Sequence, residues 1–275
     1  MPSKDDDREA ARGEIEARLK AYYEQMYRSE VGLKDWKQRV NNRINEEALY
    51  CSRYIDFLLD LFPDSIRDKD VLVVGAGTGG EIVNFANLGA RVTAVEPNEE
   101  ALEICRLKRD YYDLEGVDIS KHSLSEKCFD SDSFDLVYCQ TVIEHVKDVE
   151  ETLRQMIRVT RPQGLVFIGA PDYRQFWEPH YKLPLPMMLP RLFIQLMLRA
   201  LGRPTLFLKS LSLVTSRQFT NFFMENKVTA MRVIVPWPER WKKNPLWYEK
   251  AIMVLTKSLE IHRDQIWILK KTGER

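Results

Sequence analysis

The sequence is poor in residues on which several classes of protein depend. It has four cysteines in 275 residues, none with metal-site spacing, so we expect reduced thiols in a cytoplasmic protein. Lys plus Arg equals Asp plus Glu at 41 each, which argues against a broad nucleic-acid surface, because such surfaces carry a basic excess. Residues 1–8 are charged where a secretion signal would be apolar. No apolar run reaches the roughly 20 residues that span a bilayer.

The most informative segment is rich in glycine. Residues 71–80 read VLVVGAGTGG, so four β-prone residues precede Gly75, Gly77 and Gly79. Residues without Cβ allow a tight turn after a buried parallel strand and let a ligand approach the backbone, while the next helix directs its first N–H groups at that ligand. Glu96 follows about 20 residues later, where a carboxylate accepts hydrogen bonds from a ribose diol. The pattern predicts a ligand that contains a nucleoside.

Three further blocks follow in an order typical of one enzyme family. They are FDLVYC at 134–139, VIEHV at 142–146 and LRQMIRVTRPQGLVFI at 153–168. With the G-x-G-x-G spacing, these blocks resemble those of class I methyltransferases, which use S-adenosylmethionine (SAM). One departure is Val73, where many relatives carry an acid that organises the methionine end of the cofactor. The resemblance implies SAM as the cofactor and assigns its binding to Gly75, Ala76, Gly77, Gly79, Glu96, Pro97, Ser123, Leu124 and Gln140.

The alternation of apolar runs predicts an α/β fold with a seven-stranded, mostly parallel, Rossmann-like methyltransferase sheet and helices on both faces. Strands are expected near 70–75, 91–96, 117–121, 133–139, 164–170, 228–236 and 264–271. Helices are expected near 79–88, 98–112, 148–160, 216–226 and 246–258. The predicted organisation is a disordered tail at 1–12, a helical N-terminal cover at 13–66, and the methyltransferase domain at 67–275, with a helical lid insertion at 172–214 after strand five.

The insertion is the expected acceptor site, because long insertions at the carboxyl edge of an open sheet build substrate sites or lids. Methyl transfer needs donor and acceptor in line, and a base when the acceptor is a hydroxyl. No metal is predicted, because the acids and histidines match no metal motif. The candidate catalytic residues are His180, His145 and Asp172, although His145 alternatively holds its loop. The candidate substrate-binding residues are Tyr173, Trp177, Glu178 and Tyr181, and the alternative is a solvent-exposed lid hairpin.

The insertion is similar to that of methyltransferases of polysaccharide and glycolipid assembly, which implies O-methylation of a sugar hydroxyl on a glycan or glycolipid intermediate. One alternative acceptor is a quinone-like or other lipid-soluble molecule. Another alternative is a non-catalytic binding or regulatory protein that retains the fold, suggested by Val73 and Ser123 at positions that are often acidic. The apolar stretch 187–201 is expected to pack on the fold or line a homodimer interface, with lipid contact as the alternative.

Overall fold

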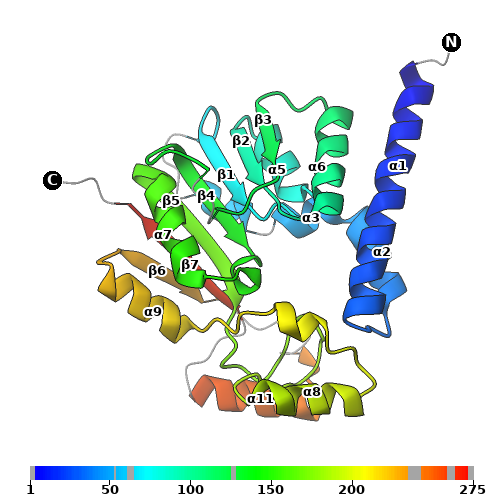
Figure 1. Cartoon of the computed structure of the whole chain (residues 1–275), viewed down its shortest axis with the longest axis vertical. Coiled ribbons are helices and arrows are strands. Elements are labelled where there is room, and N and C mark those ends of the chain that lie inside the picture. Colours follow the sequence, from blue (N-terminus) through cyan, green and yellow to red (C-terminus); the bar gives the residue numbers. More distant parts are fainter. Residues whose placement is uncertain are drawn as a thin grey trace.

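A seven-stranded sheet forms the centre of the fold (Figure 1). The strand order is β3-β2-β1-β4-β5-β7-β6, with β7 antiparallel to both neighbours and the other pairs parallel. This confirms the predicted sheet. The strands are β1 (Asp70–Val74), β2 (Arg91–Val95), β3 (Val117–Ser120), β4 (Phe134–Gln140), β5 (Thr160–Pro171), β6 (Ala230–Ile234) and β7 (Asp264–Lys270). The computed structural model describes residues 4–52, 54–60, 65–124, 128–234, 243–258 and 264–271.

Helices cover both faces of the sheet, because the side chains of each strand alternate between two cores. In β1, Val71 and Val73 belong to the core under α5 and α6, whereas Leu72 and Val74 belong to the core under α7 and α9. A strand buried on both faces requires the continuous apolar run that the sequence shows there. The covering helices are α5 (Gly80–Asn87), α6 (Glu99–Tyr111), α7 (Val149–Val159) and α9 (Ser216–Glu225).

The N-terminal part of the chain is helical and lies beside α6 (Figure 1). Its apolar side, with Ile15, Leu19 and Tyr23, packs against Ile104 of α6. The N-terminal helices are α1 (Lys4–Glu24), the π-helical η1 (Gln25–Glu30), α2 (Trp36–Asn45), α3 (Glu47–Ser52) and α4 (Ile55–Leu59).

The predicted disorder at residues 1–12 is wrong for residues 4–12, which form the first turns of α1. No proline interrupts these turns, and an ion pair at (i, i+4) spacing joins Arg12 to Glu16 at 3.0 Å. The helix therefore begins several residues before the apolar positions from which it was predicted, because these first turns continue the packed part of α1.

The insertion leaves the carboxyl end of β5 and returns to the sheet at α9. It contains one α-helix, α8 (Arg191–Ala200), and one 3₁₀ helix, η4 (Phe207–Ser210), within otherwise irregular backbone. α8 lies at the lower end of Figure 1, in the same region as α11 (Trp247–Ser258). Arg191 joins α8 to η4, because its guanidinium donates hydrogen bonds to the carbonyl oxygens of Leu208 and Leu211.

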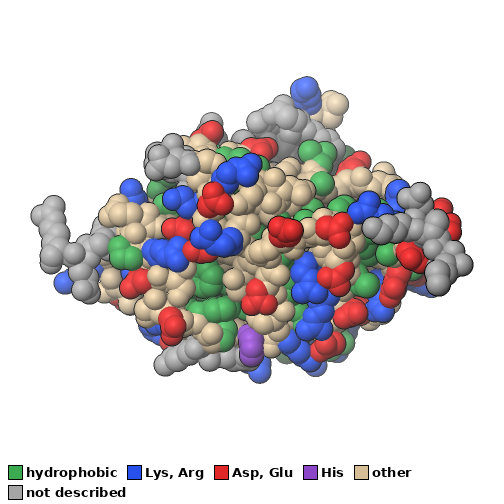
Figure 2. Space-filling view, turned by 90° about the horizontal axis from the view of Figure 1, so that it is seen from above, with side chains coloured by type: hydrophobic (Ala, Val, Ile, Leu, Met, Phe, Trp, Pro, Cys, Tyr) green, Lys and Arg blue, Asp and Glu red, His purple; other side chains and the backbone are tan. Residues whose placement is uncertain are grey.

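The surface carries charge of both signs. Figure 2 shows Lys and Arg side chains interspersed with Asp and Glu on the face viewed from above. Within the described residues, no helix combines the length and apolar character needed to span a bilayer.

Candidate active site

The glycine-rich loop between β1 and α5 turns through three left-handed glycines. The backbone φ is +67° at Gly75, +53° at Gly77 and +84° at Gly79. A Cβ at Gly75 would lie 2.5 Å from Val142, so the loop after β1 packs directly against the loop after β4. A Cβ at Gly77 would meet no atom within 4 Å, so the backbone there faces open space that a ligand can enter.

Glu96 lies just after β2, beside this loop. Its Oε2 accepts a hydrogen bond from the N–H of Gly77 at 2.8 Å, and its Oε1 accepts one from the N–H of Asn98 at 2.8 Å. Burial raises the pKa of Glu96, and the two hydrogen bonds offset part of that shift. A carboxylate has about four acceptor positions, so the pair of oxygens still has capacity for two hydroxyl groups. The geometry fits the predicted ribose site.

A chain of polar contacts ties the N-terminal helices to the glycine loop. The Oγ1 of Thr78 donates to Oε1 of Glu47 in α3 at 2.8 Å, so the hydroxyl of Tyr23 in α1, 2.9 Å away, is the donor to Thr78. Lys108 of α6 completes the chain by pairing with Glu47 and by donating to the Thr78 carbonyl oxygen at 2.8 Å. The sequence offers no local signal for these contacts, because Glu47 and Lys108 are 61 residues apart.

The other predicted cofactor residues have different surroundings. Ala76 is buried, and its N–H donates to the carbonyl oxygen of Val95 at 3.2 Å. Leu124 is buried in the sheet core, Ser123 is half-buried, and Pro97 is exposed. The Oε1 of Gln140, at the carboxyl end of β4, is buried without a hydrogen-bond partner. Their roles toward SAM remain predictions.

Two histidines predicted as bases lie together, although 35 positions separate them in the sequence. His145 ends the 3₁₀ helix η3 (Ile143–His145) after β4, and His180 belongs to the insertion. Their ring centroids are 5.5 Å apart, and the ring of Phe207 lies 5.0 Å from His180 and 5.8 Å from His145. The fold therefore forms one histidine cluster, and its His145 belongs to the loop whose Val142 packs against Gly75 of the glycine loop.

Glu178 orients His180. Its carboxylate is fully buried, and Oε1 lies 2.8 Å from Nδ1 of His180 while Oε2 accepts from the N–H of Tyr181. Burial lowers the pKa of His180, but the charge and hydrogen bond of Glu178 outweigh it and raise the pKa above its usual value. This arrangement fixes the ring and directs Nε2 away from Glu178.

Among the described residues, Glu144 and His145 lack a carboxylate partner of the kind that His180 has, and Glu144 is fully buried whereas His145 is exposed. Both carboxylate oxygens of Glu144 are buried without a hydrogen-bond partner, and burial raises its pKa to about 7. Loss of hydration and the nearby His180 lower the pKa of His145, so it is neutral at neutral pH. Glu144 was not predicted as a site residue, although its place directly before His145 was a usable signal.

Three groups in this cluster are able to hold a divalent cation together. One ligand atom each from Glu144, His145 and His180 lies within 4.8 Å of the others. Carboxylate and imidazole are common ligands for such ions. The group combines two residues of the loop after β4 with one from the insertion, so no sequence motif would have indicated it.

The aromatic residues predicted to bind substrate mostly pack in the core. Tyr173 and Tyr181 are fully buried, and the hydroxyl of Tyr181 accepts from the N–H of Leu208 at 3.1 Å. Trp177 is half-buried and stacks on Tyr248 of α11 with centroids 6.5 Å apart. The hydrogen bond to Leu208 favours a structural role for Tyr181, whereas the buried hydroxyl of Tyr173 has no hydrogen-bond partner within the part of the chain that the structure describes.

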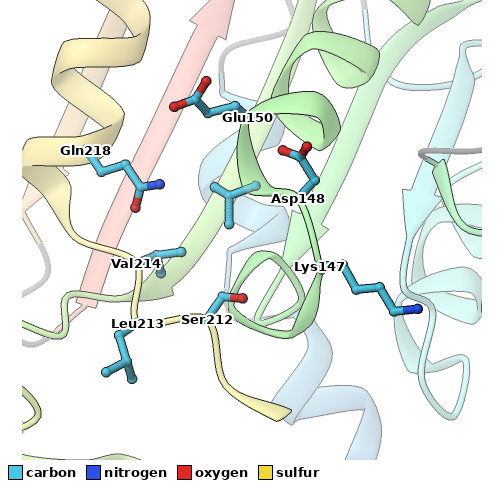
Figure 3. Close-up of a pocket in the computed structure, with 8 residues that line it drawn as sticks. Lys147, Asp148, Glu150, Ser212, Leu213, Val214 and Gln218 are labelled. Carbon is cyan, nitrogen blue, oxygen red and sulfur yellow. The ribbon is translucent and has the colours of Figure 1, made fainter. Parts of the chain in front are cut away.

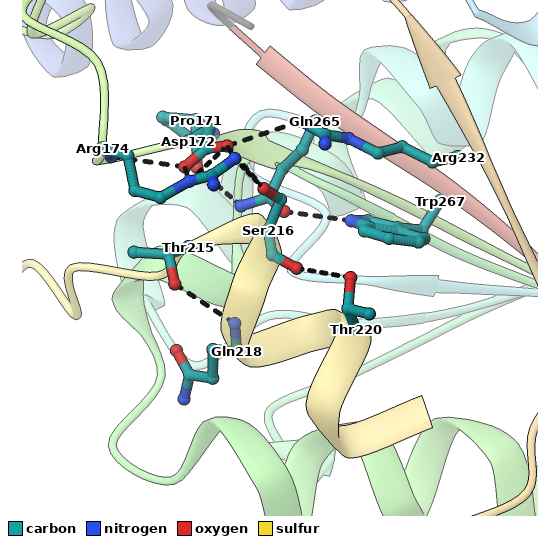
Figure 4. A network of polar contacts seen from close by, with 10 residues as sticks. All are labelled: Pro171, Asp172, Arg174, Thr215, Ser216, Gln218, Thr220, Arg232, Gln265 and Trp267. Atoms are coloured by element: carbon teal, nitrogen blue, oxygen red, sulfur yellow. Dashed lines mark hydrogen bonds and ion pairs between the residues drawn. The ribbon is translucent and has the colours of Figure 1, made fainter. Parts of the chain in front are cut away.

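Asp172 belongs to a separate polar network (Figure 4). Its carboxylate is fully buried and contacts Arg174 at 2.8 Å, the Oγ of Ser216 at 2.7 Å and Arg232 at 3.4 Å. Burial alone would raise the pKa of Asp172, but these hydrogen bonds and charges outweigh it, so the net pKa lies below its usual value. A carboxylate held in this way joins the insertion to α9 and β6. The contacts do not support the predicted catalytic role of Asp172.

A polar pocket of about 570 Å³ lies beside the loop that carries His145 (Figure 3), because Ser212, which lines the pocket, donates to the carbonyl oxygens of Glu144 and Val146. It is bounded by the start of α7 and by the segment before α9. No predicted site residue lines it, so the site assignment rests on the loops described above. The lining residues are Lys147, Asp148, Val149, Glu150, Ser212, Leu213, Val214 and Gln218.

Comparison with known families agrees with this geometry. Residues 72–168 match the family model described as a methyltransferase domain. The chain carries a class I methyltransferase domain. Similar curated proteins include the ubiquinone biosynthesis O-methyltransferases of Pseudomonas entomophila, 33% identical over 38% of this chain and 46% of the relative, and of Aeromonas salmonicida, 34% identical over 37% and 43%. The similarity thus spans less than half of each relative.

Solved structures of methyltransferases share the fold of this chain over most of its length. A SAM-dependent methyltransferase from Archaeoglobus fulgidus is 16% identical, with a TM-score of 0.54 over 85% of this chain and 99% of the other. Geranyl diphosphate C-methyltransferase from Streptomyces coelicolor, solved with Mg²⁺, geranyl-S-thiolodiphosphate and S-adenosylhomocysteine, is 12% identical, with a TM-score of 0.56 over 90% and 84%. At these identities the likeness concerns the fold alone.

Proposed function

We propose that the protein is a SAM-dependent O-methyltransferase whose acceptor is a lipid-soluble molecule with a phenolic hydroxyl, such as a quinone precursor. The observation that carries the proposal is the Glu178–His180 pair beside His145, whose loop contacts the glycine loop through Val142 and Gly75. A cofactor loop alone fits any SAM-dependent reaction. An oriented imidazole beside it fits acceptors that must lose a proton.

The residues fit SAM on two observations: the open space at Gly77 and the acceptor capacity of Glu96. Bound SAM supplies an activated methyl group on a sulfonium. Glu96 would hold the ribose hydroxyls, and the Gly77 backbone would allow close approach of the ligand. The contacts of Tyr23 and Glu47 with Thr78 would hold the loop in place from the N-terminal side.

On the acceptor side, His180 would take the hydroxyl proton on Nε2 while Glu178 stabilises the imidazolium that forms. His145 would stay neutral beside it and contribute a second polar edge. Phe207 lies against both rings and provides an apolar surface for a ring-shaped acceptor.

The strength of this base favours a phenol over a sugar. A phenol has a pKa of about 10, as tyrosine does, which is within a few units of a histidine with a raised pKa. A sugar hydroxyl is a far weaker acid, so proton transfer to imidazole would be much less favourable. The relatives named for ubiquinone biosynthesis support the same choice, and they favour the quinone-like alternative over the glycan that the insertion suggested. A lipid-soluble acceptor also implies that the enzyme works at a membrane surface.

Methyl transfer from labelled SAM to a catechol and to a neutral sugar tests the proposal. We expect methylation of the catechol only, and a rate at least about 100-fold lower for His180→Gln, as for loss of a general base. The matched control is His122→Gln, which lies outside the histidine cluster. Methylation of the sugar would restore the glycan reading. Absence of SAM binding to well-folded protein would establish the non-catalytic alternative.

A further inference from the structure

The insertion and the start of α9 differ from the rest of the chain in charge. Residues 179–224 contain no Asp or Glu, although the chain as a whole has 41 acids and 41 basic residues. The basic residues of this stretch are Lys182, Arg191, Arg199, Arg203, Lys209 and Arg217. A chain with no net charge thus has a continuous basic segment around α8.

The same segment exposes apolar side chains. α8 buries Ile194 and Leu198 against the core, yet its opposite side is also apolar, with Leu192, Phe193 and Leu196 exposed. A surface helix ordinarily presents polar residues to water. Residues flanking α8 extend the exposed apolar set, and clustering of this kind marks an interaction surface. The docking face comprises Met188 (67% exposed), Leu189 (43%), Leu192 (62%), Phe193 (56%), Leu196 (51%), Leu201 (54%) and Leu206 (69%).

We propose that this docking face binds the surface of a membrane that contains anionic lipid, with α8 lying in the plane of the interface. The apolar side chains would enter the acyl boundary, and the exposed Arg199 and Lys209 would meet the headgroups. Charge argues for this occupant over a second copy of the chain. A two-fold interface places the same patch on both subunits, so two acid-free basic segments would face each other.

The docking face also adjoins the histidine cluster. η4 follows α8 after the short segment 201–206, and its Phe207 contacts both His145 and His180. If the acceptor is lipid-soluble, as in the proposed function, docking would bring it from the bilayer to the side of His180. Binding to lipid itself does not depend on that function, so the two are tested separately.

Cosedimentation of the full chain with vesicles tests the docking face. Vesicles of phosphatidylcholine alone are compared with vesicles that contain phosphatidylglycerol. We expect binding to the anionic vesicles, weakened about 100-fold by Leu192→Gln with Leu196→Gln through loss of apolar burial. Arg199→Gln with Lys209→Gln should weaken it about 25-fold, at about fivefold for each cation.

The matched control is Leu49→Gln with Met224→Gln, whose side chains are 72% and 73% exposed outside the docking face. It should bind like the wild type, and circular dichroism checks the fold of each variant. Equal binding to both kinds of vesicle would refute anionic recognition. No binding, together with a dimer that only the α8 variant dissociates, would show that the face joins two chains. Methylation of a water-soluble catechol by the α8 variant separates loss of docking from failure of the proposed function.

Discussion

Glu178→Gln is the most direct test of the histidine cluster, because it removes one charge while preserving shape. The Glu178 carboxylate accepts from Nδ1 of His180 through one oxygen and from the N–H of Tyr181 through the other. A glutamine has one acceptor oxygen and one donor NH₂ group. With its oxygen toward the N–H of Tyr181, the glutamine directs its NH₂ group at Nδ1 of His180, which accepts that hydrogen bond only when His180 is neutral with its proton on Nε2. When His180 is protonated, two donors face each other.

The expected loss follows from that count. An unsatisfied buried donor costs about 1–3 kcal/mol, so the free energy of unfolding should fall by that amount at about pH 5, where His180 is protonated. The pKa of His180 should also fall, because the carboxylate that raises it is gone. In the wild type, the stabilisation from protonated His180 is complete below the unfolded pKa of about 6.5 and is lost as pH rises through the higher folded pKa. The variant should show a smaller decline over that window.

Urea unfolding between pH 5 and 9 measures the stability, and NMR titration of the imidazole measures the pKa. The control is Glu150→Gln, which removes an exposed carboxylate paired with Arg154 and should change little. If catalysis needs neutral His180, the alkaline rise in methylation rate should move to lower pH in the Glu178 variant. An unchanged His180 pKa with unchanged stability would refute the pairing as described.

Three further predictions concern single residues. Glu96→Ala should weaken SAM binding at least about 100-fold, because two hydrogen bonds to a charged acceptor contribute about 1.5–3 kcal/mol each; calorimetric titration checks this, and Glu99→Ala, exposed on α6, should bind normally. Gly75→Ala should destabilise by about 1–3 kcal/mol because φ is +67° and the new Cβ would clash, whereas Gly13→Ala in α1, with no atom within 4 Å, should stabilise by about 0.5–1 kcal/mol in thermal unfolding. In the wild type, the free energy of unfolding should fall by about 3 kcal/mol between pH 4.5 and pH 7, because the native state holds the Glu144 proton up to a pKa of about 7 and the unfolded state releases it earlier. Glu144→Gln should abolish this fall. An unchanged pH profile would contradict the burial of that carboxylate.

The sheet was predictable from the sequence because its information is local. Each strand is a short apolar run, and three of the covering helices start at a side-chain cap, which is Asn98 before α6, Asp148 before α7 and Thr215 before α9. The glycine loop was also predictable from the sequence, because the positive φ at Gly75, Gly77 and Gly79 favours glycine over other residues. The disorder predicted for the N-terminal tail was wrong for residues 4–12, because this part of α1 is helical only as a continuation of the part that packs further along the helix.

The amino-acid sequence by itself determined the α/β class, the strand positions and the cofactor loop, since period, caps and glycine conformation are properties of neighbouring residues. Only the tertiary structure decided which polar side chains meet. It places the ring of His180 against that of His145, buries Glu144 beside them, and pairs Asp172 with Arg174 in a separate network. Such pairings depend on where the insertion crosses the sheet edge, and no local pattern encodes that crossing. Likewise, the sequence predicted that the apolar stretch 187–201 packs against the fold or a partner, but only the tertiary structure decided which of its apolar side chains face water.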